Sequence, residues 1–244
     1  MDDMERDCRA YELQDHRPRL LDLFCGAGGA AMGYHRAGFD IVGVDIKPQP
    51  NYPFGFVQAD ALEFLGEAID KFCPFNYVDA IHASPPCQVY STTSSLHDNE
   101  HPDLIAPTRN LLAQLDEEGV PWVIENVVGA PLLHPFRLCG SSFGLGVRRH
   151  RLFETNWPIG MVPPCSHHDH PRPLDVTGTG ASRIGDRKDG GGGNSRKPRN
   201  LDEARSAMGI NWMSSVELSQ AIPPAYTEFI GHQLLAQIGA KVGC

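Results

Sequence analysis

The segment Asp22-Leu23-Phe24-Cys25-Gly26-Ala27-Gly28-Gly29 determines the fold class more than any other stretch of this chain. The apolar run that leads into it, residues 20–24, predicts a buried strand, and residues 30–37 predict a helix that ends at Gly38. Glycines between the two let the backbone turn sharply and approach a ligand, while the start of the helix offers free N–H groups. The segment therefore predicts a strand, a turn and a helix that bind a nucleotide-like cofactor.

Further apolar stretches predict strands that end at polar residues. These strands are residues 41–44 before Asp45, 55–58 before Asp60, 77–83 before Ser84-Pro85-Pro86-Cys87, and 121–124 before Glu125 and Asn126. Thr108 is expected to cap a helix that carries Leu111, Leu112 and Leu115. Alternating strands and helices predict an α/β fold with a doubly wound, mostly parallel sheet, in which ligands bind outside the carboxyl ends of the strands.

The pattern changes after about residue 155, which suggests how the chain is organised. We expect an acidic N-terminal tail at residues 1–18, a catalytic, cofactor-binding domain at 19–155, a short loop-rich insert at 156–203, and a segment at 204–244 that returns to the catalytic domain. Within the last segment, the apolar positions of residues 225–238 predict a closing helix.

Composition limits the classes of protein to consider. With 244 residues and 41% hydrophobic content, the chain can bury one sizeable core. It has no apolar run of about eighteen residues and no secretory signal, and its seven cysteines show no C-x-x-C spacing. We therefore expect a soluble, cytoplasmic monomer with free thiols. The net charge of −9 disfavours nucleic acid as a partner, whereas basic clusters at residues 148–151 and 183–199 favour it.

Cys87 is the strongest candidate for a nucleophile. Pro85 and Pro86 stiffen the chain before it, and its polar flank (residues 88–93) argues against the alternative, a small buried hydrophobe. Glu125, at the end of a later strand, suits proton donation if partial burial raises its pKa. The arginines Arg148, Arg149 and Arg151 can clamp a carbonyl or phosphates.

A second group of residues suits a metal. Cys165, His167, His168 and His170 offer thiolate and imidazole ligands for zinc, with Cys139 a conceivable addition. Their spacing matches no strong zinc signature, so a polar loop is the favoured interpretation and no metal is predicted.

The order of these motifs resembles that of the cytosine-C5 DNA methyltransferase family, in particular its compact bacterial or phage-type members. The resemblance covers roughly residues 20–155 and resumes around 204–238. It implies a Rossmann-like methyltransferase fold and S-adenosylmethionine as methyl donor. It also implies the catalytic residues Cys87, Glu125, Arg149 and Arg151, and the cofactor-binding residues Phe24, Cys25, Gly26, Gly28, Gly29, Asp45, Ile46, Asp60, Ala61 and Pro86.

The family resemblance further implies methyl transfer to C5 of cytosine in double-stranded DNA, through a covalent Cys87 adduct on a flipped-out base. Residues 156–203 would then be a short target-recognition insert whose basic side chains contact DNA. The expected setting is a bacterial cell or phage-infected host, and a cognate restriction endonuclease is a partner that the sequence leaves open.

The sequence differs from the family's motifs at two places, and three other functions remain open. Val147 stands where the family usually has Gln, and residues 220–226 stand where it commonly has a Gly-Asn pair that touches the cofactor. The alternatives are a tRNA cytosine-C5 methyltransferase, a nicotinamide-dependent oxidoreductase, and a catalytically idle DNA-binding relative. The oxidoreductase leaves Cys87 and Glu125 without a role, and the presence of both residues disfavours the idle relative.

Overall fold

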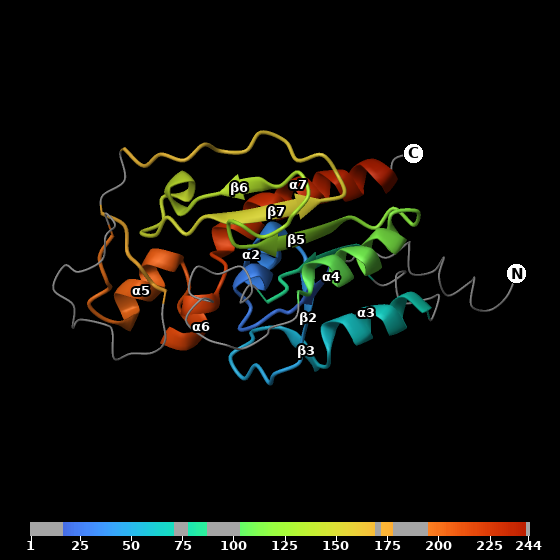
Figure 1. The fold of residues 1–244 in the computed structure, drawn as a ribbon, viewed down its shortest axis with the longest axis horizontal. Coiled ribbons are helices and arrows are strands. Elements are labelled where there is room, and N and C mark those ends of the chain that lie inside the picture. Colours follow the sequence, from blue (N-terminus) through green and yellow to red (C-terminus); the bar gives the residue numbers. More distant parts are fainter. Residues whose placement is uncertain (1–16, 71–77, 87–102, 169–171, 178–194, 243–244) are drawn as a thin grey trace, which may run out of the picture.

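The computed structural model describes residues 17–70, 78–86, 103–168, 172–177 and 195–242. At its centre lies a sheet with the strand order β3-β2-β1-β4-β5-β7-β6 (Figure 1). The elements are, in chain order, β1 (Arg19–Leu23), α2 (Gly29–Ala37), β2 (Asp40–Asp45), β3 (Gly55–Gln58), α3 (Ala61–Asp70), β4 (Ala80–Ala83), α4 (Ile105–Leu112), η3 (Ala113–Leu115), β5 (Trp122–Asn126), β6 (Phe136–Leu138), η4 (Gly140–Phe143), β7 (Arg151–Thr155), α5 (Leu201–Met208), α6 (Ser215–Gln220) and α7 (Pro224–Val242).

The pairing confirms the predicted doubly wound, mostly parallel sheet. Strands β1 to β5 pair in parallel, and only β7 and β6 run antiparallel to their neighbours. Along β1, Leu20 packs into a core with α2 and α7, whereas Leu21 and Leu23 pack into a core with α3 and α4. Because successive side chains of a strand point to opposite faces, one apolar strand supplies both cores.

Two local predictions were wrong. The strand expected at residues 77–83 is shorter, since β4 begins at Ala80 and Tyr77 lies outside the described residues. Thr108 lies inside α4, where its hydroxyl donates to the Leu104 carbonyl at 2.6 Å. The helix begins earlier than expected because Pro107 fits a first helical turn, where no N–H partner is needed.

Beyond β7, the chain forms a smaller third cluster. Helices α5 and α6 lie together at one end of the molecule (Figure 1) and pack against Ala27, Val147 and Leu174. The described residues between β7 and α5 contain no helix or strand, and one bridge joins Leu174 to Arg196. α5 begins at Leu201, just before the segment expected to start at residue 204, and the domain boundaries stay predictions. Among the described helices, none is both long and apolar enough to cross a membrane.

Helix α7 packs very closely on α2. A Cβ atom added to Gly33 would overlap Thr227 Oγ1 and the Pro224 carbonyl oxygen. The Thr227 hydroxyl donates to the Ala30 carbonyl at 2.8 Å, and a Cβ at Gly231 would lie 2.6 Å from the Ala37 Cβ. Small residues therefore let α7 reach α2, and α7 is fixed over the glycine-rich turn.

Gly33→Ala should destabilise the fold by ~1–3 kcal/mol, because the added methyl group forces α2 and α7 apart. The control is Gly66→Ala in α3, where a Cβ would meet nothing within 4 Å. That change should stabilise by ~0.5–1 kcal/mol, since alanine favours the helix. Urea unfolding followed by circular dichroism measures both. Equal stability of the two variants would contradict the close contact.

Candidate functional site

The glycine-rich turn leaves open space at one of its glycines. Gly26 has φ +49°, and a Cβ added there would meet nothing within 4 Å. A Cβ at Gly28 would instead lie 2.9 Å from Pro53, and one at Gly29 would overlap the Ile222 carbonyl oxygen. Gly28 and Gly29 thus make room for other parts of the protein, while Gly26 leaves room for a ligand.

Asp45 and Asp60 lie at neighbouring strand ends, as predicted. Asp45 Oδ2 accepts from the Gly26 N–H at 3.0 Å and Oδ1 accepts from the Lys47 N–H at 2.9 Å. Asp60 Oδ1 accepts from the Leu62 and Glu63 N–H groups and so caps α3, in which Ala61 is buried. A carboxylate has about four acceptor positions, so Asp45 can still bind two hydroxyl groups.

Apolar and acidic side chains complete this edge. Ile46 is 62% exposed next to Asp45, which makes it a suitable platform for a flat apolar group. Asp22 is fully buried, and burial raises its pKa to about 8, opposed by a hydrogen bond from Tyr52. Burial also raises the pKa of the Cys25 thiol well above its ordinary value, so Cys25 is a poor nucleophile.

Behind Glu125 lies a chain of buried polar side chains. The Tyr34 hydroxyl is 3.0 Å from His82 Nδ1, and His82 Nε2 is 2.8 Å from Ser84 Oγ. Burial lowers the pKa of His82 to about 3, so the ring is neutral. If Tyr34 donates to Nδ1, the Nε2–H donates to Ser84, whose hydroxyl then donates to Glu125. Sequence reasoning missed His82 and Tyr34. A histidine within the apolar strand β4 was the signal that could have pointed to a buried polar network.

Glu125 is buried and faces an arginine. Its Oε1 lies 3.0 Å from Arg151 Nε, and 8% of its side chain is exposed. Burial raises the pKa of the Glu125 carboxyl, while Arg151, Arg149 and the Ser84 hydrogen bond act in the opposite direction. The carboxyl group is therefore held in an environment where it can carry a proton.

The segment that leads to Cys87 is anchored to β5. The Asn126 side chain donates to the Pro85 carbonyl at 3.0 Å, and the Ser84 N–H donates to the Leu23 carbonyl at 3.1 Å. Pro85 is buried and Pro86 is exposed, while Cys87 itself lies outside the described residues. Asn126 has a positioning role that the sequence did not reveal.

The arginine motif is held by the end of the chain. Arg149, at φ +35°, donates through Nε to the Ala221 carbonyl at 2.8 Å and through Nη2 to the Ser219 carbonyl at 2.7 Å. The Tyr226 hydroxyl lies 2.9 Å from the Arg149 carbonyl. Val147 is 1% exposed within the third cluster, which accounts for an apolar residue at a position where the family usually has Gln. Arg149 therefore braces the C-terminal segment.

That C-terminal segment also closes over the glycine turn. Trp212 Nε1 donates to the Ala27 carbonyl at 2.9 Å, and the Asn51 amide donates to both Glu217 carboxylate oxygens at 3.0 Å. Together with the contact between Ile222 and Gly29, these bonds place residues 212–222 beside the predicted cofactor turn. No sequence motif pointed to Trp212.

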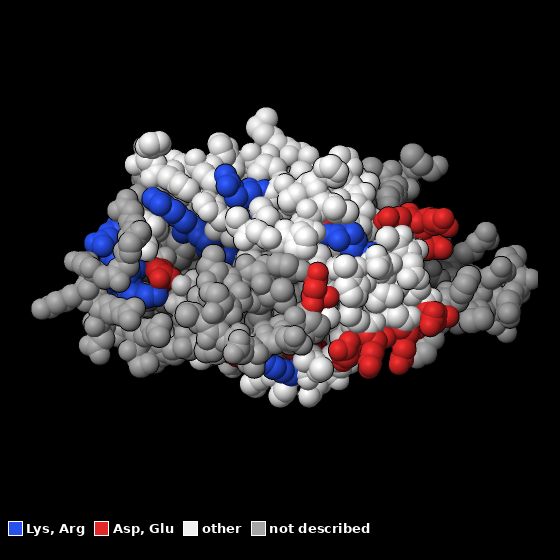
Figure 2. Space-filling view, viewed as in Figure 1, with Lys and Arg blue, Asp and Glu red and all other residues white. Residues whose placement is uncertain are grey.

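Basic residues of the insert pair with acidic ones. Arg196 lies 2.8 Å and Arg199 3.1 Å from Glu203, and Lys197 lies 2.6 Å from Asp175. Arg183, Arg187 and Lys188, also predicted to contact DNA, lie outside the described residues. Figure 2 shows Lys and Arg toward the end that carries α5, and Asp and Glu over α3 and the segment after α4.

Residues 18–129 match the C-5 cytosine-specific DNA methylase family. Among curated proteins, the Type II methyltransferase M.AgeI of Thalassovita gelatinovora is 29% identical over 122 residues, which make up 46% of this chain and 28% of that protein. M.FnuDI of Fusobacterium nucleatum is 33% identical over 91 residues, 34% of this chain and 25% of that protein. The matched regions thus span about a quarter of the length of these relatives.

Solved structures share the fold along nearly the whole chain. A prophage-encoded protein of E. coli, described as a DNA modification methyltransferase, gives a TM-score of 0.58 at 18% identity and covers 91% of this chain and 99% of its own. The Dnmt2 methyltransferase of S. pombe gives 0.56 at 13% identity and covers 90% and 98%. Together with the glycine turn and the buried glutamate, the match over residues 18–129 supports the predicted resemblance to the C-5 cytosine-specific DNA methylase family.

Proposed function

We propose that this chain transfers a methyl group from S-adenosylmethionine to C5 of cytosine in double-stranded DNA. The observation that carries the proposal is the buried pair of Glu125 and Arg151, which lies at the end of β5 next to the anchored segment before Cys87. The family match over residues 18–129 supports the same reaction, and that range includes Cys87 and Glu125.

The residues at the cofactor edge fit S-adenosylmethionine. Gly26 leaves open space, Asp45 can accept from the ribose hydroxyls, and the exposed Ile46 can pack against the adenine. The sulfonium and ammonium groups are positive, which suits an edge that carries Asp45 and the buried Asp22, because a bound cation favours the ionised form of a carboxyl group. When bound, the cofactor supplies an electrophilic methyl group. Phe24 and Pro86 complete the proposed contacts.

The protein side chains make C5 of cytosine reactive. The Cys87 thiolate adds to C6, and the displaced electron pair reaches N3, which takes a proton from Glu125. C5 then behaves as an enamine and bonds to the methyl group, whose bond to the sulfonium sulfur breaks and leaves a neutral thioether. Loss of the C5 proton to a base, departure of the thiolate and return of the N3 proton to Glu125 restore the aromatic ring and free Cys87.

DNA must present the base outside the helix, because C6 is stacked in a duplex. Arg151 would hold the O2 edge of the flipped cytosine, while Arg149 keeps the C-terminal segment beside the cofactor turn. The name "Type II methyltransferase" of the curated relatives supports a role beside a restriction endonuclease.

Tritium transfer from labelled S-adenosylmethionine tests the substrate. Duplex DNA should be labelled at cytosine, and neither tRNA nor a mixture without nucleic acid should be. Labelling of tRNA alone would replace DNA by RNA as the substrate.

Cys87→Ser should abolish methylation, since the serine hydroxyl is a far weaker nucleophile than a thiolate. A duplex with 5-fluorocytosine blocks the loss of the C5 substituent and should trap the unchanged protein covalently, but not the variant. Cys25→Ser serves as the control and should still be trapped, because that thiol is buried and of raised pKa. A trapped peptide that contains another cysteine would overturn the assignment.

Glu125→Gln should slow turnover by about a hundredfold or more and leave cofactor affinity nearly unchanged. In the unchanged protein, the protonated carboxyl is the active form, so turnover should fall as pH rises through the raised pKa of Glu125. Single-turnover rates across pH measure both effects, with exposed Glu118→Gln as control. If the turnover of Glu125→Gln fell with rising pH as that of the unchanged protein does, the titrating group would be another residue.

Asp45→Ala should weaken S-adenosylmethionine binding by ~1–3 kcal/mol, because it removes hydrogen bonds to a charged acceptor. Asp40→Ala, at the opposite end of the same strand β2, is the matched control and should bind normally. Calorimetry gives both affinities. Equal affinities would place the cofactor elsewhere.

A further inference from the structure

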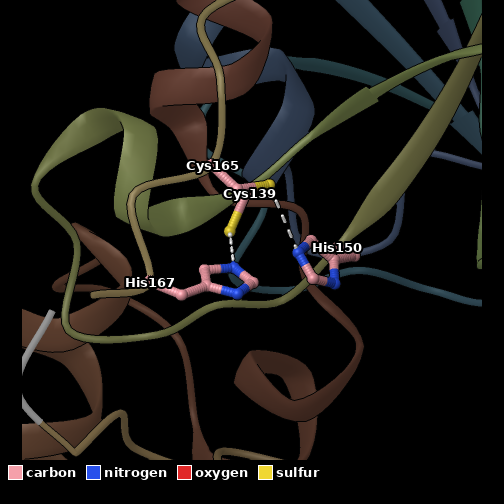
Figure 3. A group of neighbouring side chains, drawn as sticks. All are labelled: Cys139, His150, Cys165 and His167. Atoms are coloured by element: carbon pink, nitrogen blue, oxygen red, sulfur yellow. Dashed lines mark hydrogen bonds between the residues drawn. The ribbon is translucent and has the colours of Figure 1, made fainter.

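Four potential metal ligands converge beside the arginine motif. Cys139 follows β6, His150 precedes β7, and Cys165 and His167 belong to the loop after β7 (Figure 3). Their ligand atoms all lie within 4.8 Å of one another, and both sulfurs are free thiols. Of the predicted candidates, His168 is exposed outside this group and His170 lies outside the described residues.

The distances suit a tetrahedral ion. Cys139 Sγ lies 3.3 Å from His167 Nε2, and Cys165 Sγ lies 3.6 Å from His150 Nε2. Zinc bonds of about 2.3 Å to sulfur and about 2.0 Å to nitrogen set sulfur and nitrogen roughly 3.5 Å apart at the corners of a tetrahedron. Each cysteine thus stands beside one histidine at close to the separation that a shared ion would require.

The surrounding contacts hold the ligands in place without an ion. Ser141 Oγ accepts from the Ser166 N–H at 3.1 Å and also lies 3.1 Å from Cys139 Sγ. The Ser142 hydroxyl donates to the Pro164 carbonyl at 2.8 Å. The turn η4 thereby fixes the loop that carries Cys165 and His167, so an ion would meet ligands already close to their final positions.

We infer that Cys139, His150, Cys165 and His167 bind one structural zinc ion. Two thiolates and two imidazoles are a donor set that zinc prefers, and four protein ligands leave no open coordination position for catalysis. Cys139 is 1% exposed, and the other three ligands are partly buried. The inference does not depend on the proposed methyl transfer.

The position of the site suggests what the ion stabilises. The described residues from 156 to 200 have no helix or strand to anchor them, and a metal can replace the core that such a segment lacks. His150 lies between Arg149 and Arg151, so the ion would also fix the start of β7, from which Arg151 reaches Glu125. Zinc would thus join the insert to the arginine motif.

Elemental analysis of the purified full chain tests the site, with an expected content of about one zinc per chain. Cys139→Ser, Cys165→Ser and His167→Ala should each reduce the content to about a tenth or less. His168→Ala, next to a ligand but exposed, is the matched control and should keep the ion.

A second measurement does not depend on whether the variants fold. The unchanged protein loaded with Co²⁺ should show the visible bands of a tetrahedral, thiolate-ligated ion, and Zn²⁺ should displace them. Chelation should lower the melting temperature, and added zinc should restore it. A disulfide between Cys139 and Cys165, a zinc-grown protein without metal, or zinc that persists in Cys139→Ser would overturn the inference.

Discussion

The close contact between α2 and α7 is the constraint on which the site depends. Because Gly33 leaves room for Thr227 and the Pro224 carbonyl, α7 lies directly on α2. Tyr226, in the first turn of α7, then reaches the arginine motif, and Ile222 covers Gly29. Residues nearly two hundred positions apart therefore form one edge.

At this edge, buried polar side chains are linked by hydrogen bonds. Tyr34, His82, Ser84 and Glu125 form a continuous chain in which each group satisfies the next, and such a network fixes the orientation of its last member. Burial alone would not fix the orientation of the Glu125 carboxyl group. The hydrogen bond from Ser84 and the charge of Arg151 direct its two oxygens. The chain of bonds explains why a neutral histidine occupies the apolar strand β4.

Much of the fold was predictable, since apolar runs ending at glycine or carboxylate residues mark β1, β2 and β5 directly. The role of each glycine was not, because only the fold shows that Gly28 faces Pro53 while Gly26 faces open space. Of the four proposed zinc ligands, only His150 was not a candidate from the sequence, for a related reason. It lies before β7, whereas Cys165 and His167 follow that strand, and the pairing of β6 with β7 brings it to Cys139.

On the face shown in Figure 2, acidic and basic side chains gather toward opposite ends of the molecule. One end carries the carboxylates of α3 and of residues 116–118, and the opposite end carries the arginines and lysines near α5. In the field of a polyanion, such a molecule experiences a torque that turns its acidic end away. Salt limits this torque to the last ~10 Å of approach, so orientation is selected just before contact although the net charge is repulsive.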